Sequence, residues 1–368
     1  MTKKRCFFDI LLIVMFLLGL FGPLISTHNR EKSAIEKRRL RALPDWKWEK
    51  ETIITFPGEF QEWFTDHFGF RDHLAQAYYL LGFALGSSTT PNVIIGKRQW
   101  LFHIAPMDGN NLEDYRKHDS LSLTELQQLR TTLEAKYIWL KQHGTLYVFI
   151  VAPNKQSIYG EHFPSRVRVV GTQSRFDQFI EYMQGSEVPI LDLREPLIQA
   201  KKKGRLYYKT DTHWNSFGAA VAQYEIMQAI AKHYPNIHPV SYSAEDFSWN
   251  RRKGGDIARL LNLANILKEG SSPVLRQSAS ECEKRDLPAT RSFMTNCSPM
   301  APSILIFRDS FFTALQPYIS QYFSKSVYVW EQEPPDFERV KQLSEQYAPH
   351  IVIEERAERY LKAVTTSP

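Results

Sequence analysis

The apolar run LYVFIV at residues 146–151 decides the fold class. A continuous apolar run of this length predicts a strand that is buried on both faces, as in parallel sheets covered by helices. The residues before it predict a helix. Ser122 and Glu125 match a capping box, and apolar residues then recur every three or four positions. Gly144 follows as the C′ residue that ends the helix. A helix that leads directly into a buried strand is typical of α/β proteins.

Four further candidate strands follow along the chain. They are Val188–Leu193, Ile304–Phe307, Val327–Trp330 and Ile351–Ile353. Helical patterns separate most of them, so we expect an α/β sandwich with a largely parallel central sheet. Two short strands around a turn are expected at 93–96 and 100–102. Ligands of such sheets bind at the carboxyl ends of the strands, so functional residues should directly follow the apolar runs.

Composition excludes several classes of protein. The chain has 368 residues, enough for one or two domains, and its 43% apolar and 23% charged residues are typical of a globular protein. Three cysteines exclude a disulfide scaffold and a four-cysteine zinc site. The net charge of +6 is mild, and we find no basic repeat with stacking aromatics, no P-loop and no dinucleotide glycine motif. We therefore expect no nucleic-acid partner and no cofactor.

The N-terminus predicts export. Basic residues at 3–5 precede an apolar segment whose uninterrupted part, 10–22, has the length of a signal-peptide h-region and is shorter than a full span of ~20 residues. We expect residues 1–27 to form a signal anchor, a transmembrane segment with its basic end in the cytoplasm. A cleaved signal peptide and a buried core helix are the alternatives. Export makes Cys282 and Cys297 candidates for a disulfide, and the sequence leaves their pairing open.

The segment between the anchor and the first strands divides into two parts. We expect residues 28–90 to form a polar stalk and a helical lead-in, because aromatic residues recur at helical spacing after position 60. Within it, His67 and His73 stand among acidic residues and resemble a metal cluster at first sight. Phe68 and Phe70 are interleaved with them, so we interpret this stretch as a structural corner and expect no metal site. Residues 91–368 would form the α/β domain.

One candidate nucleophile follows a predicted strand directly. The run Ile304–Phe307 is followed by Asp309 and Ser310, after which a helical pattern begins. A serine at a helix N-terminus has an unpaired main-chain N–H group that can face a developing oxyanion. The alternative is that Ser310 is only an N-cap residue.

A candidate base and its acid lie on another loop. Asp211 and His213 precede a helix that Asn215 or Ser216 would cap. Serine chemistry needs an imidazole to accept the hydroxyl proton and a carboxylate to orient that imidazole, and this loop offers both. A surface loop and a pair of metal ligands are the alternatives, although no convincing third ligand accompanies them.

Six segments in sequence order resemble the alginate O-acetyltransferase family of the AlgJ and AlgX type, which has an SGNH-hydrolase-like catalytic domain. They are Asp66–Arg71, Gly96–Phe102, Ala152–Tyr159, Asp211–Trp214, Asp309–Phe311 and Pro349–Arg359. The Asp-x-His-Trp and Asp-Ser-Phe motifs are the most specific. The chain ends 58 residues after Ser310, so we expect it to be closer to AlgJ, without the carbohydrate-binding module of AlgX-type proteins.

The resemblance implies a three-layer sandwich and a triad of Ser310 as nucleophile, His213 as base and Asp211 as orienting acid. Their order along the chain is the reverse of that in ordinary SGNH hydrolases. Asn154, which follows the strand at 146–151, is a candidate for the oxyanion asparagine.

Two basic residues are candidates for substrate contacts. Lys155 would bind a carboxylate of the polymer or pair with an acid. Arg308 stands where the family commonly has glycine, and it would either bind an anionic substrate or crowd the turn.

The function implied is an O-acetyltransferase that moves acetyl groups onto hydroxyls of an exported, alginate-like polysaccharide through an acetyl-serine intermediate. The resemblance also implies a membrane-bound O-acyltransferase that supplies the acetyl group, and a catalytic domain in the periplasm attached to the inner membrane. The alternatives are a polysaccharide acetylesterase with the same triad and a non-catalytic subunit of a polysaccharide secretion complex.

Overall fold

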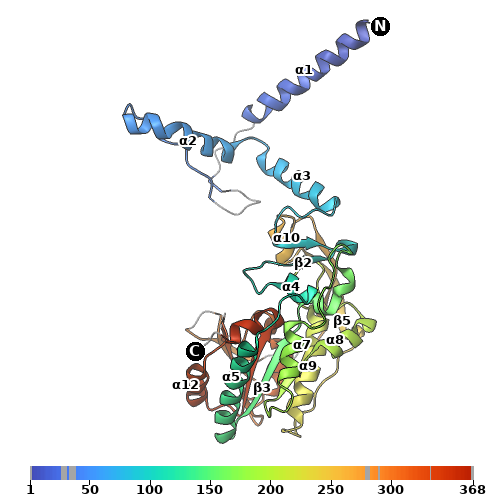
Figure 1. Cartoon of the computed structure of the whole chain (residues 1–368), viewed down its shortest axis with the longest axis vertical. Coiled ribbons are helices and arrows are strands. Elements are labelled where there is room, and N and C mark those ends of the chain that lie inside the picture. The colour runs from blue at the N-terminus through green and yellow to red at the C-terminus, as the bar shows by residue number, and fades with distance from the viewer. Residues whose placement is uncertain are drawn as a thin grey trace. The chain divides into compact units, whose positions relative to one another are not determined.

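The computed structural model describes residues 2–25, 31–32, 39–277, 282–288, 291–331 and 333–365. Figure 1 shows the chain coloured by residue number. It forms two compact units, of which the first holds Met1–Thr89 with Leu261–Leu263 and the second holds the remainder.

The first unit is helical. Its helices are α1 (Thr2–Ile25), α2 (Lys50–His67) and α3 (Arg71–Ala84). The helical lead-in is therefore confirmed, whereas residues 26–30 and 33–38 of the expected stalk lie outside the described residues. Among the helices of the described residues, none has both the length and the apolar character that crossing a membrane requires. The transmembrane segment expected over residues 1–27 is thus not confirmed.

A tight corner joins α2 to α3. Phe70 has a left-handed backbone with φ of 63°, and α3 starts at the next residue. The buried His67 ring stacks on Trp63 with 5.0 Å between centroids, and its Nδ1 lies 2.9 Å from the Trp63 carbonyl oxygen. These contacts fit the interpretation of this stretch as a structural corner.

The second unit is built on a seven-stranded sheet in the order β4-β3-β11-β9-β10-β8-β7. The strands are β3 (Leu146–Ala152), β4 (Ile190–Asp192), β7 (Glu283–Asp286), β8 (Phe293–Asn296), β9 (Ser303–Arg308), β10 (Lys325–Trp330) and β11 (Ile351–Ala357). Strands β4, β3, β11, β9 and β10 are parallel, as expected, while β8 and β7 add an antiparallel edge that the sequence analysis missed. The sheet is therefore mixed.

Helices cover both faces of this sheet, which gives three layers (Figure 1). They include α5 (Leu123–Gln142), α7 (Arg175–Tyr182), α8 (Arg194–Ala200), α9 (Ser216–Ala231) and α12 (Phe337–Tyr347). Alternate residues of β3 point to opposite faces, so Tyr147 and Phe149 pack with α5, α7 and α12, whereas Val148 and Ile150 pack with α8 and α9. The capping box of α5 is present, with Glu125 N donating to Ser122 Oγ at 3.2 Å.

Smaller antiparallel pairs complete the unit. They are β1 (Val93–Ile95) with β2 (Leu101–His103), and β5 (Phe247–Lys253) with β6 (Lys268–Leu275). The short helix α10 (Asp256–Leu260) lies between β5 and β6 in the chain. A disulfide joins Cys282 to Cys297 across the open end of the β7–β8 pair, so the candidate pairing is confirmed.

Candidate active site

Ser310 lies two residues beyond the carboxyl end of β9, where the parallel-sheet rule predicts a functional residue. Instead of the expected continuous helix, a 3₁₀ turn over Phe311–Ala314 follows, and then the short helix α11 (Gln316–Ile319). Asp309 fixes this turn, because its carboxylate accepts hydrogen bonds from the N–H groups of Phe311 and Ala357, each at 2.8 Å. The turn is thereby attached to the end of β11.

Asp211 and His213 lie on the loop that leads into α9. Asn215 is the N-cap of this helix, and its side-chain oxygen accepts from the N–H groups of Phe217 at 3.0 Å and Gly218 at 2.9 Å. Capping fixes the direction in which the loop enters the helix.

The structure brings the three predicted residues together. His213 Nε2 lies 2.8 Å from Ser310 Oγ, across 97 positions of sequence, and His213 Nδ1 lies 2.7 Å from Asp211 Oδ1. Asp211 is buried. Burial alone would raise the pKa of its carboxyl, but the hydrogen bonds and the charge that His213 offers outweigh burial and hold this pKa well below its usual range. Asp211 is therefore an ionised acceptor.

This geometry suits base-assisted attack by a hydroxyl. A carboxylate that accepts from Nδ1–H fixes the imidazole tautomer, so that Nε2 carries a lone pair toward the serine hydroxyl. The Nε2–Oγ distance is within hydrogen-bond reach, as a nucleophile and its base require.

His213 and Ser310 open onto a pocket of about 400 Å³. It is lined by His103, Asp108, Thr212, His213, Asp256, Arg259, Leu260, Ser310 and Arg359. Arg359 is buried, its guanidinium lies over the Phe311 ring at 5.6 Å, and its Nε is 3.8 Å from Asp108. The Arg359 Nε atom has no hydrogen-bond partner. A buried cation beside Ser310 can stabilise negative charge that develops there.

The model of the family described as "SGNH hydrolase-like domain, acetyltransferase AlgX" matches residues 93–332. The chain belongs to this family. The matched region includes β9, Ser310 and the loop of Asp211 and His213, and the resemblance found in the sequence is confirmed.

Curated relatives of the family match about half of the chain. Two of them are called "Probable alginate O-acetylase AlgJ". The protein of Pseudomonas syringae pv. tomato is 28% identical to this chain over 172 residues, and that of Pseudomonas aeruginosa is 25% identical over 193 residues. The first match covers 47% of this chain and 42% of the relative, and the second covers 51% and 46%. The chain thus spans less than half the length of these curated relatives.

Solved structures of low identity resemble the fold. Bacillus cereus PatB1 has 14% identity and a TM-score of 0.50, and the match covers 75% of this chain and 99% of the PatB1 chain. The O-acetyltransferase domain of Pseudomonas putida AlgJ has 22% identity and a TM-score of 0.46, and the match covers 74% of this chain and 93% of that domain. At such identity the PatB1 likeness supports the fold alone.

Asn154 follows a different strand from Ser310. It follows β3, and β11 lies between β3 and β9 in the sheet. Its main-chain N–H donates to Glu358 at 2.8 Å, and none of the hydrogen bonds given for the described residues joins it to Ser310. Asn154 is buried and does not line the pocket, so the oxyanion role expected for it has no supporting contact.

Lys155 supports the loop of the site. Its buried Nζ donates to three main-chain carbonyl oxygens, those of Tyr208, Lys209 and Asp211, at 3.2, 3.2 and 2.7 Å. Burial lowers the pKa of this ammonium group to about 8. With its three N–H groups so used, Lys155 has none left for a substrate.

Arg308 also has a structural position. The buried guanidinium lies over the Trp330 ring at 4.7 Å and donates to the carbonyl oxygens of Asp309 at 3.2 Å and Arg291 at 2.9 Å. It is not among the residues that line the pocket. Arg308 also donates to Thr313 Oγ1 in the turn after Ser310, at 3.1 Å, so its side chain ties this turn to β10.

Two pocket residues, Asp256 and Arg359, escaped the sequence analysis. Asp256 lies in α10, far from the motifs in sequence, and Arg359 was noted only as part of a closing segment. Asp211, His213 and Asp256 have potential ligand atoms within 4.8 Å of one another. Asp256 is thus a third possible metal ligand, which the sequence analysis did not find beside the other two. A metal bound there would have to displace the hydrogen bond between His213 Nδ1 and Asp211.

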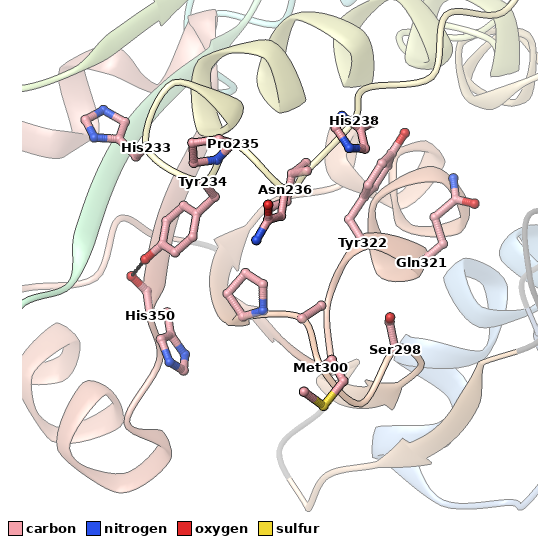
Figure 2. A pocket seen from close by; sticks show the side chains of 13 residues that line it. His233, Tyr234, Pro235, Asn236, His238, Ser298, Met300, Gln321, Tyr322 and His350 are labelled. Atoms are coloured by element: carbon pink, nitrogen blue, oxygen red, sulfur yellow. Dashed lines mark hydrogen bonds between the residues drawn. The ribbon is translucent and has the colours of Figure 1, made fainter.

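A larger pocket, of about 690 Å³, lies at the amino ends of the strands, away from Ser310. Figure 2 shows Asn236, His238 and Tyr322 on one side of it and His350 on another. None of the sequence-predicted site residues lines this pocket.

Proposed function

We propose that this chain is an O-acetyltransferase that transfers acetyl groups to hydroxyls of a polysaccharide through an acetyl-serine intermediate. The observation that carries the proposal is the hydrogen-bonded series from Ser310 through His213 to Asp211. Membership of a family described as an AlgX acetyltransferase supports the acyl chemistry. The names of the AlgJ relatives support an alginate-like acceptor.

In the first half-reaction, Ser310 Oγ attacks the carbonyl carbon of the acetyl donor while His213 Nε2 accepts the hydroxyl proton. The tetrahedral intermediate collapses, the bond to the leaving group breaks, and the leaving group takes the proton from His213. In the second, a sugar hydroxyl gives its proton to Nε2 and attacks the acetyl-serine. Ser310 leaves and recovers a proton from His213, so the enzyme returns to its starting state.

Two donors are suited to the oxyanion of both intermediates. The main-chain N–H of Ser310 lies at the start of the 3₁₀ turn, and the Arg359 guanidinium lines the same pocket. Preorganised donors of this kind supply a large share of the stabilisation in acyl transfer. Arg359 thus takes the role that we expected for Asn154.

We further propose that the catalytic unit works in the periplasm with a membrane-bound O-acyltransferase as its acetyl supplier. The disulfide between Cys282 and Cys297 supports an oxidising compartment. The supplier is what the resemblance to the alginate O-acetyltransferase family implies.

The test is to incubate the full chain with 4-nitrophenyl acetate and alginate oligosaccharides, and to measure acetyl esters on the sugar and free acetate. We expect sugar esters with the native chain and none with Ser310→Ala. Acetate alone, even with excess sugar, would show an acetylesterase. Neither product with the native chain, and no acyl-enzyme, would show a non-catalytic subunit.

A further inference from the structure

We propose that Asp256 is a positioning residue that holds His213 in its active tautomer and orientation, acting through Thr212 and Asp211. The inference rests on the proposed function, because it assigns a role within the same site. Asp256 belongs to α10 and lies 45 positions from Asp211.

The first argument is the set of hydrogen bonds around Asp256. Its carboxylate accepts from the main-chain N–H of Thr212 at 2.8 Å and from the hydroxyl of Thr212. Its own main-chain N–H donates to Asp211 Oδ2 at 3.2 Å. Asp211 Oδ1 is left to accept from His213, at both its Nδ1 and its main-chain N–H. Each oxygen of the orienting carboxylate therefore has its own partner.

The second argument concerns the Thr212 hydroxyl. Because its proton is donated to Asp256, Oγ1 presents a lone pair toward His213 Nδ1, which lies 3.1 Å away. The Nδ1–H group then faces two acceptors, Asp211 Oδ1 and Thr212 Oγ1. An imidazole protonated at Nδ1 keeps Nε2 free to accept the proton of Ser310.

The third argument is the close approach of the backbone before α10. A Cβ atom at Gly255 would lie 2.3 Å from both Cβ and Oδ2 of Asp211, so only glycine fits there. The Gly255 N–H donates to Thr210 Oγ1 at 2.9 Å, and the Ala258 N–H donates to the Thr210 carbonyl at 3.1 Å. The start of α10 is thus docked along the loop that carries Asp211 and His213.

Asp256 also contributes charge. Its Oδ2 lies 3.6 Å from His213 Nδ1, so it favours the imidazolium that forms when Ser310 loses its proton. The other charged or titratable groups that line the pocket are His103, Asp108, Arg259 and Arg359. Asp211 and the buried ammonium group of Lys155 also lie close enough to interact with this site.

The test compares kcat and KM of Asp256→Asn with those of the native full chain in the hydrolysis of 4-nitrophenyl acetate. An asparagine amide can donate to Thr212 Oγ1, which turns the threonine hydroxyl toward Nδ1 and favours the wrong tautomer. We expect kcat/KM to fall on the order of 10- to 100-fold, through a lower kcat with KM little changed. Thr212→Val removes the hydroxyl and should also lower kcat/KM. Thr212→Ser keeps the hydroxyl and should retain most of the native kcat/KM.

Asp286→Asn is the matched control, because Asp286 is an exposed residue of β7, and it should leave kcat/KM unchanged. Unchanged kcat and KM in Asp256→Asn, with activity lost in Ser310→Ala, would overturn the role of Asp256 but leave the proposed function standing. Activity retained in Ser310→Ala would overturn the proposed function itself. One bound metal ion per chain, with activity lost to chelator and restored by the metal, would make Asp256 a ligand and overturn its positioning role.

Discussion

Trp214 Nε1 donates a hydrogen bond to the main-chain carbonyl oxygen of Phe311 at 3.0 Å. This bond joins the residue after His213 to the residue after Ser310, so it fixes the distance between the two loops of the site. The indole is buried and meets the Phe311 ring edge-on at 5.2 Å.

Trp214→Phe should therefore reduce both activity and stability. It keeps much of the apolar contact but removes the donor, so the Phe311 carbonyl loses its partner at a cost of about 1–3 kcal/mol in the free energy of unfolding. We expect kcat/KM to fall by about 100-fold, because a 1 Å displacement between reacting groups has an effect of that order. Steady-state kinetics and urea unfolding of the same variant measure the two effects. A loss of stability with unchanged kcat/KM would contradict the role of this bond.

Asp211→Asn tests the tautomer argument directly. The amide can donate to Nδ1, so the imidazole would be protonated at Nε2 and could no longer accept the serine proton. We expect kcat to fall on the order of 10⁴-fold, as for loss of the acid in serine triads. Thermal unfolding should show that the variant is folded, and a decrease below tenfold would argue against Asp211 as the orienting acid.

The strands and helices that the sequence predicted correctly are those with a strong hydrophobic period. Strand β9 and helix α5 have such a pattern, whereas β7 consists of Glu283–Asp286, four exposed polar residues. That strand depends on pairing with β8 and on the nearby disulfide, and neither interaction leaves a local pattern. The turn after Ser310 was misjudged because Asp309 anchors it to β11, a tertiary contact.

The site was predictable only in part. Short sequence motifs contain Asp211, His213 and Ser310, and the residue types in these motifs indicate serine chemistry. The three residues could therefore be predicted from the sequence. Asp256 and Arg359 could not be predicted, because neither stands in such a motif and only the tertiary structure brings their side chains to the pocket. The position of Lys155 could not be predicted, because its ammonium group is buried among main-chain carbonyl oxygens that only the tertiary structure brings to it.

A buried ion pair should matter for stability. Lys136 of α5 and Glu354 of β11 are fully buried, with 2.9 Å between Nζ and Oε2, and the Tyr147 hydroxyl also donates to Glu354 at 2.8 Å. Lys136→Met removes the cation nearest to Glu354 and leaves only Arg356, whose Nε is 4.0 Å from Oε1, so we expect the free energy of unfolding to fall by about 3–5 kcal/mol. The double variant Lys136→Met, Glu354→Gln should recover part of this loss in urea unfolding. Equal stability of Lys136→Met and the native chain would contradict the prediction.

Glu358 should make stability depend on pH. Burial, followed by the charge of Asp114, raises the pKa of Glu358 from 4.5 to about 7. Between these values the folded state holds a proton that the unfolded state has lost, so stability is greatest below about pH 4.5 and falls as pH rises to about 7. The contribution is up to about 3 kcal/mol. Glu358→Gln should reduce this pH dependence, and an unaltered dependence in the variant would contradict it.

The acetyl-serine is the central claim, and peptide mapping by mass spectrometry after brief exposure to 4-nitrophenyl acetate and acid quenching tests it most directly. The account predicts one added acetyl group on the peptide that contains Ser310, absent from Ser310→Ala. An acetyl group on another residue that turns over, or undiminished turnover in Ser310→Ala, would contradict it.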